Sequence, residues 1–301
     1  MRLLVFLIAS VLLFSCTPAQ DESTDGRIKV VCTTSIMTDW VSNVASVNIE
    51  VVPLLKVGID PHVYKPSKKD LDLLREADVI IYHGLHLEGK IIEVLEHMQD
   101  KLIIDASKNF PKESIIRDLN FPASTDPHAW FAKELAKSAI KTIVGELLQN
   151  YPVKAGGIRR KMDDYFLAID SIAKEVNYIV STIPKPKRLV ITTHDALSYF
   201  ARDYGLRVKT LQGASTVSEF GLREITDLVD FIVDQRVPAI FLENIISPQA
   251  MESVQRGCAA KGFEVKIGPE LLSDSLGSEE EQNTYFKMLI FNAKTIAEYL
   301  K

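Results

Sequence analysis

Cysteine is scarce in this sequence. The 301 residues include three cysteines, at positions 16, 32 and 258. Cys32 and Cys258 fall in opposite halves of the chain, which favours two buried free thiols over a disulfide. Neither has a second cysteine or a histidine at the spacing of a thiolate metal site, so no such site is expected. The 47% of hydrophobic residues is ample for two buried cores, and the length suggests about two domains.

A basic stripe, a low-complexity segment and a long hydrophobic run are also missing. The formal net charge is −5, so no nucleic-acid partner is predicted. A weakly acidic surface is compatible with a cationic ligand. The N-terminal apolar run, residues 3–14, is too short to span a bilayer comfortably.

The N-terminus has the features of an export signal. Arg2 precedes the apolar run, and Ser15-Cys16 follows it in a pattern that resembles a bacterial lipobox. We predict a signal peptide at 1–15 and a tether at 16–26, lipidated at Cys16. The protein would then be extracytoplasmic and anchored by lipid to a bacterial membrane, in the periplasm or at the cell surface. A plain secretory signal with an incidental Cys16 is the alternative.

Strand-like and helix-like segments alternate on both sides of one long amphipathic segment. Strands are predicted at residues 28–32, 51–55, 79–82, 102–105, 189–193, 208–211, 239–242 and 265–267. Helices are predicted at 67–76, 129–150, 195–204, 218–235, 248–261 and 279–300. Such alternation predicts βαβ units with mostly parallel sheets.

The long segment keeps its apolar residues on one helical face from Ile158 to Val180. We therefore predict an α/β protein with two similar lobes, at 27–155 and 184–301, joined by one long rigid helix at 156–183. An ordinary helix inside a single domain is the alternative.

Three histidines and one aspartate stand near the ends of predicted strands. They are His62, His128, His194 and Asp274, with the histidines equally spaced along the chain. Ligands of open α/β sheets bind at the carboxyl ends of strands, so these side chains are expected to converge. Together they would form a four-ligand site for a divalent transition metal. If all four bind, no coordination position stays open, which favours carrying a metal over catalysis with it.

Carboxylates adjoin these histidines in the sequence. Asp60 and Asp126 begin two copies of the tripeptide Asp-Pro-His, and Asp195 directly follows His194. A carboxylate in such a place can accept the second ring N–H and fix the tautomer. Asp195 could equally cap a helix.

Other residues could lie near the site. His83 and His86 follow a predicted strand and could form a second site or border the first. Glu243 ends the strand at 239–242 and could face the cleft, behind a ligand or as a spare one. His97 is predicted on a solvated helix face.

Six short stretches together identify a family. The chain resembles the solute-binding lipoproteins of zinc, manganese and iron ABC transporters, the TroA-like group. The similar stretches are residues 60–67 (DPHVYKPS), 84–90 (GLHLEGK), 126–130 (DPHAW), 193–196 (THDA) with 199–200 (YF), 211–213 (LQG) and 272–277 (LSDSLG).

The resemblance implies two α/β lobes joined by a long rigid helix, with metal held between them and passed to an ABC permease. The family's four ligand positions map onto His62, His128, His194 and Asp274, and its cleft lies near His86. A monomer is predicted. We further hypothesise that Asp274 moves with its lobe and that its departure opens the site.

The metal stays open between zinc, manganese and iron. Some manganese-binding members have glutamate where this chain has His194, and many zinc-specialised members have a histidine-rich loop. The corresponding stretch here, residues 89–120, holds only His97, which favours manganese or iron. The ligand set itself accepts zinc readily, and zinc has the higher intrinsic affinity.

Two other classes of function remain as alternatives. A mononuclear zinc metallohydrolase would need an open coordination position and a general base, and the chain has no His-Glu-x-x-His motif. A receptor for haem, cobalamin or a siderophore would need a broad aromatic or basic cleft. An adhesive role could accompany any of these.

Overall fold

The computed structural model describes residues 26–98, 100–117, 124–217 and 220–301. The predicted signal peptide and Cys16 lie outside the described residues. Below, the N-terminal half denotes the described residues before the long helix α5 (Ile158–Ser181), and the C-terminal half those after it.

The N-terminal half is built on a four-stranded parallel sheet in the order β2-β1-β3-β4. Its strands are β1 (Ile28–Cys32), β2 (Ile49–Pro53), β3 (Val79–Tyr82) and β4 (Leu102–Asp105). Alternate residues of β1 face opposite sides: Val30 and Cys32 pack in one core cluster, and Val31 in another. Helices cover both faces, as parallel sheets require. They are α1 (Ser35–Val44), α2 (Lys68–Glu76), α3 (Gly89–Leu95) and α4 (Lys133–Asn150).

The C-terminal half repeats this plan. Parallel strands β5 (Leu189–Thr192) and β6 (Arg207–Thr210) form one pair, and β7 (Ala239–Glu243) and β8 (Lys266–Leu271) form another. Strand β5 of the first pair lies beside strand β7 of the second, so the two pairs are adjacent. The helices of this half are α6 (Ser198–Tyr204), α7 (Leu222–Gln235), α8 (Gln249–Ala260) and α9 (Tyr285–Leu300). Single 3₁₀ turns occur at Lys112–Ser114, Ala129–Phe131 and Lys185–Lys187.

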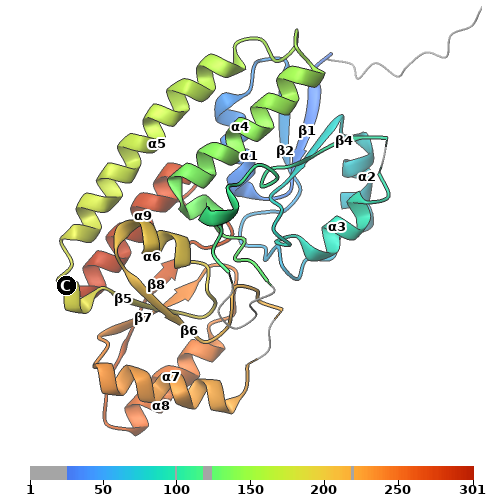
Figure 1. Ribbon diagram of the computed structural model, residues 1–301. Coiled ribbons are helices and arrows are strands. Elements are labelled where there is room, and N and C mark those ends of the chain that lie inside the picture. Colours follow the sequence, from blue (N-terminus) through green and yellow to red (C-terminus); the bar gives the residue numbers. More distant parts are fainter. Residues whose placement is uncertain (1–25, 99, 118–123, 218–219) are drawn as a thin grey trace, which may run out of the picture.

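Helix α5 runs alongside both halves (Figure 1). Its 24 residues make it about 36 Å long at 1.5 Å per residue. One face is buried from Ile158 to Val180 and packs on α1, α4, α6 and α9. A continuous helix of this length restricts how far the halves can separate at the edge that it covers.

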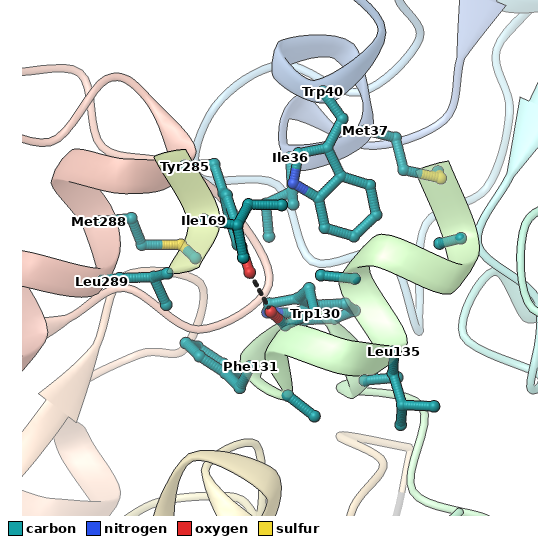
Figure 2. Close-up of a cluster of buried hydrophobic side chains, with 14 of the residues drawn as sticks. Ile36, Met37, Trp40, Trp130, Phe131, Leu135, Ile169, Tyr285, Met288 and Leu289 are labelled. Atoms are coloured by element: carbon teal, nitrogen blue, oxygen red, sulfur yellow. Dashed lines mark hydrogen bonds between the residues drawn. The ribbon is translucent and has the colours of Figure 1, made fainter. Parts of the chain in front are cut away.

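The largest core cluster is continuous across the two halves. Trp40 of α1, Trp130 and Phe131 of a 3₁₀ turn, and Tyr285 of α9 are all buried in it (Figure 2). Trp40 and Tyr285 pack edge to face with ring centroids 5.3 Å apart. The hydroxyl of Tyr285 donates to the carbonyl oxygen of Trp130 at 2.5 Å. The halves are therefore joined by packed aromatic side chains as well as by α5.

The structure confirms the predicted fold class, and several element boundaries differ from the predicted ones. The helix predicted at 129–150 is a 3₁₀ turn followed by α4, because Ala132 is extended and interrupts it. The helix predicted at 279–300 starts at Tyr285, because the Thr284 side chain caps it by accepting from the amide of Lys287. Strand β2 begins two residues early because Ile49 pairs with Ile28. The sequence patterns did not predict helices α1 and α3.

The division into lobes at 27–155, 156–183 and 184–301 stays a prediction. Cys32 and Cys258 are both buried and free. Among the described residues, none of the helices combines the length and the apolar character of a membrane span.

Candidate metal centre

Four segments far apart in the chain bring His62, His128, His194 and Asp274 together. One ligand atom from each lies within 4.8 Å of the others, and all four residues are buried. His194 and Asp274 lie in the first three residues after strands β5 and β8. His62 and His128 lie farther along the loops that follow β2 and β4, so the expectation that they stand at strand ends was only approximate. The loops bring both histidines next to His194 and Asp274.

The distances between these atoms match a ligand shell. The Nε2 atom of His128 lies 3.4 Å from Nε2 of His62 and 3.2 Å from Nε2 of His194. A carboxylate oxygen of Asp274 lies 3.0 Å from Nε2 of His62, 3.3 Å from Nε2 of His128 and 3.5 Å from Nε2 of His194. Four atoms bonded at about 2.0–2.1 Å to a tetrahedral ion lie about 3.3 Å apart. Five of the six residue pairs are therefore already spaced for one such ion.

Two of the imidazoles are backed by carboxylates. Nδ1 of His128 lies 2.7 Å from Oδ1 of Asp126, and Nδ1 of His194 lies 2.5 Å from Oε2 of Glu243. An N–H donated from Nδ1 to a carboxylate leaves the Nε2 lone pair facing the centre. Glu243 also accepts from the amides of Thr193 and His194, at 2.9 and 2.8 Å. These contacts hold both rings in the orientation that a metal ligand needs.

The other acidic candidates have different partners. Asp60 accepts from the amide of His62 at 2.8 Å and from the Thr216 hydroxyl at 2.7 Å. Asp195 accepts from the Ser198 hydroxyl at 2.7 Å. Sequence adjacency suggested Asp195 as the carboxylate behind His194, whereas the structure places Glu243 there.

The local charges shift the pKa values strongly. Burial by itself would lower the pKa of His128, but the carboxylates of Asp274 and Asp126 outweigh it and raise that pKa to about 9. Burial opposes the shift of His194 too, yet Glu243 and Asp274 raise its pKa well above the ordinary value. Asp274 shows the reverse: burial would raise its pKa, and the two histidines hold it well below the usual range. The centre therefore favours positive charge.

His83 and His86 do not join the cluster. His86 is exposed, with a left-handed backbone (φ 64°). His83 is buried, and burial lowers its pKa to about 3, so its ring is neutral. The His83 ring packs edge to face on Trp130 (4.9 Å), which packs in turn on His128 (5.2 Å). His83 therefore supports the wall of the site through Trp130.

Glu88 holds the turn that carries these two histidines. Its buried carboxylate accepts from the Thr33 hydroxyl and from the amide of His83, both at 2.6 Å. Burial raises the pKa of Glu88 to about 7. It faces these donors and is not part of the four-residue cluster.

The segment around Asp274 is fastened to both halves. The Trp130 indole donates to the Ser273 carbonyl oxygen at 3.1 Å, and the Gly58 amide donates to the Ser275 hydroxyl at 2.8 Å. From the C-terminal half, the Asn244 amide donates to the Ser275 carbonyl oxygen at 3.1 Å. Sequence reasoning missed Ser275 and Asn244, because short polar residues in loops carry no periodic signal.

Comparison with known proteins places the chain in a family. Residues 30–299 match the model of the ZnuA family, described as the periplasmic component A of a zinc-uptake complex. The chain belongs to this family. The family is a component of uptake complexes and not an enzyme, and nothing in the comparisons supports a metallohydrolase.

Two relatives match almost the whole chain. The manganese-binding lipoprotein MntA of Bacillus subtilis (strain 168) is 34% identical over 98% of this chain and 97% of its own length. The zinc-binding protein TroA of Treponema pallidum (strain Nichols) is 33% identical over 94% of this chain and 92% of its own. The structure of the periplasmic zinc-binding protein TroA from Treponema pallidum superposes with a TM-score of 0.87 at 33% identity, covering 91% of this chain and 99% of that one.

Proposed function

We propose that this ZnuA-family chain captures one divalent transition-metal ion between its two halves and delivers it to the permease of an ABC transporter. The observation that carries the proposal is the spacing of His62, His128, His194 and Asp274, whose donor atoms lie 3.0–3.5 Å apart in five of the six residue pairs and within 4.8 Å in all of them. We propose these four as the ligands. With all four bound and buried, the ion has no open face for catalysis, as suits a carrier.

Each ligand has a distinct role in this proposal. His128 and His194 are the preorganised donors, because Asp126 and Glu243 fix their rings. Asp274 supplies the negative charge that offsets part of the cation's lost hydration. Among the described residues, neither of its oxygens has a hydrogen-bond donor other than the imidazoles that face it. A bound cation would give this buried carboxylate a partner once the imidazoles have lost their protons.

Zinc and manganese are both reasonable cargoes. Oδ2 of Asp274 faces His62 while Oδ1 faces His128 and His194, so the carboxylate can bind through one oxygen or two. One-oxygen binding gives the four-coordinate geometry of zinc, and two-oxygen binding gives the higher coordination that manganese accepts. The relatives are named for manganese and for zinc. Iron stays a sequence-based prediction.

The cellular setting is also part of the proposal. We place the protein outside the cytoplasm, lipidated at Cys16 and acting as a monomer of two lobes. The support is the lipobox-like sequence and the lipoprotein name of the MntA relative.

Metal content tests the proposal. The protein purified from native envelope should hold about one transition-metal ion per chain by mass spectrometry, and metal-free protein should regain one when titrated. In direct competition at equal free concentration, zinc should displace manganese, following the intrinsic order of divalent affinities. A folded protein that retains neither metal would contradict the proposal.

A further inference from the structure

Two identical tripeptides near the centre are used in different ways. In Asp126-Pro127-His128, Oδ1 of Asp126 contacts both the amide (2.9 Å) and the ring Nδ1 (2.7 Å) of His128. In Asp60-Pro61-His62, Oδ1 of Asp60 accepts from the amide of His62 at 2.8 Å, and the described residues show no contact between it and the His62 ring. The second oxygen of Asp60 instead accepts the hydroxyl of Thr216 at 2.7 Å. That hydrogen bond crosses from the N-terminal to the C-terminal half, and we call it the clasp.

The loop that carries Thr216 is fastened to the turn that carries His194. The amides of Leu211 and Gln212 donate to the carbonyl oxygen of Thr193, at 3.1 and 2.8 Å. The amide of Asp195 donates back to the carbonyl oxygen of Gly213 at 3.1 Å. Hydrogen bonds therefore lead from the backbone of His62 through Asp60 to Thr216, and the loop backbone from Thr216 to Leu211 is hydrogen-bonded to the residues on both sides of His194.

The clasp lies at the solvent edge of the interface between the halves. Asp60 and Thr216 are half-buried and line the same groove, of about 530 Å³. Beside them, Val63 is 48% exposed and Val217 is 64% exposed.

Another edge of the interface is sealed by the aromatic core around Trp130 and Tyr285 and by α5. Separating the halves there would break packed core contacts, which is costly. Separating them at the clasp breaks two partly buried hydrogen bonds, Thr216 to Asp60 and, in the same loop, Gly58 to Ser275. The clasp edge is therefore where the site can open at least cost.

We propose that Thr216 is a positioning residue for metal retention, acting through Asp60 to keep the His62 loop closed over the bound ion. The inference rests on the proposed function. The hydroxyl touches no ligand atom, so it acts on the rate of opening and not on the metal bonds. Its effect must therefore be the same for zinc and for manganese, in contrast to a change in the ligands.

The test replaces Thr216 with valine, which keeps the shape and removes the hydroxyl, and with serine, which keeps the hydroxyl. The control is Thr226→Val, because Thr226 is an exposed helical threonine whose hydroxyl donates to the Leu222 carbonyl oxygen within α7. Release of Zn²⁺ and of Mn²⁺ into excess chelator is followed by tryptophan fluorescence in a stopped-flow instrument. Melting of the metal-free proteins is measured alongside.

Loss of a hydrogen bond to an ionised carboxylate is expected to accelerate release about tenfold in T216V. The acceleration should be equal for both metals, with the association rate and the metal-free melting temperature unchanged. T216S and T226V should behave like the wild type. Release from T216V at the wild-type rate, an acceleration for one metal only, or an acceleration matched by a lower metal-free melting temperature would each overturn the clasp. A wild type that binds neither metal would instead overturn the proposed function.

Discussion

Replacing Asp274 with alanine is expected to weaken metal binding about a thousandfold. Asp274 is the one carboxylate among the four clustered residues, and its oxygens lie within 3.5 Å of all three Nε2 atoms. Removing one partner from a buried charged cluster costs about 3–5 kcal/mol, and each 1.4 kcal/mol is a tenfold change. Isothermal titration of the metal-free variant with Zn²⁺ and Mn²⁺ measures the change.

Two further variants separate charge from shape. Asp274→Asn keeps the shape and one oxygen and removes the charge, so most of the loss should persist. Glu270→Gln removes an exposed carboxylate on strand β8, a few residues away, and should leave affinity unchanged. An Asp274→Ala protein that is folded and still binds metal within about tenfold of the wild type would exclude Asp274 as a ligand.

Metal affinity is expected to rise about tenfold or more per pH unit from pH 6 to pH 8. The carboxylates of Asp274 and Asp126 overcome the effect of burial and raise the pKa of His128 to about 9, so this ring is protonated in the metal-free protein at pH 7. The pKa of His194 is raised too, by Glu243 and Asp274 against burial. An imidazole must lose its proton to bind metal, so capture releases at least one proton, and the affinity rises with pH accordingly.

The metal-free protein should respond to pH in the opposite direction. The pKa of His128 is higher in the folded state than its ordinary value of 6.5, so its stabilisation is complete below pH 6.5 and is lost as pH rises towards 9. Between pH 7 and 9 the melting temperature of metal-free protein should fall, while the increment that metal adds should grow. This window lies above the Glu88 pKa of about 7, so Glu88 contributes little to the slope.

Asp274→Asn is the matched control for this pH dependence. Without the Asp274 charge the pKa of His128 loses its main support, so the metal-free slope between pH 7 and 9 should flatten. Proton release is measured directly by calorimetry in buffers of different ionisation enthalpy. Metal affinity that stays flat from pH 6 to 8, with no proton released, would contradict the assigned charges.

The clustering of the four residues could be predicted from the sequence because each stands in a short motif that is recognisable without the structure. Alternation of strands and helices places His194 directly after one predicted strand and Asp274 in the loop after another, and the Asp-Pro-His repeat marks His62 and His128. The partner of His194 was harder to find. Adjacency suggested Asp195, yet the backbone turns the Asp195 carboxylate to Ser198, and Glu243 reaches the ring from strand β7.

Contacts between the halves could not be predicted from local patterns. Thr216 and Ser275 are short polar residues in irregular loops, and the hydroxyl of each has a partner in the other half of the chain. The core cluster that is continuous across the two halves could not be predicted for the same reason. Trp130 and Tyr285 look like ordinary amphipathic positions in the sequence, and their shared hydrogen bond spans 155 residues. Periodicity reports which face of an element is buried, but not which distant element covers it.

A structure of the zinc-loaded protein, with the ion located by anomalous scattering, tests the central claim most directly. The account predicts a single strong peak between the halves, with Nε2 of His62, His128 and His194 and a carboxylate oxygen of Asp274 at about 2.0–2.2 Å from it. A peak elsewhere, with these four side chains still in direct contact with one another, would contradict it.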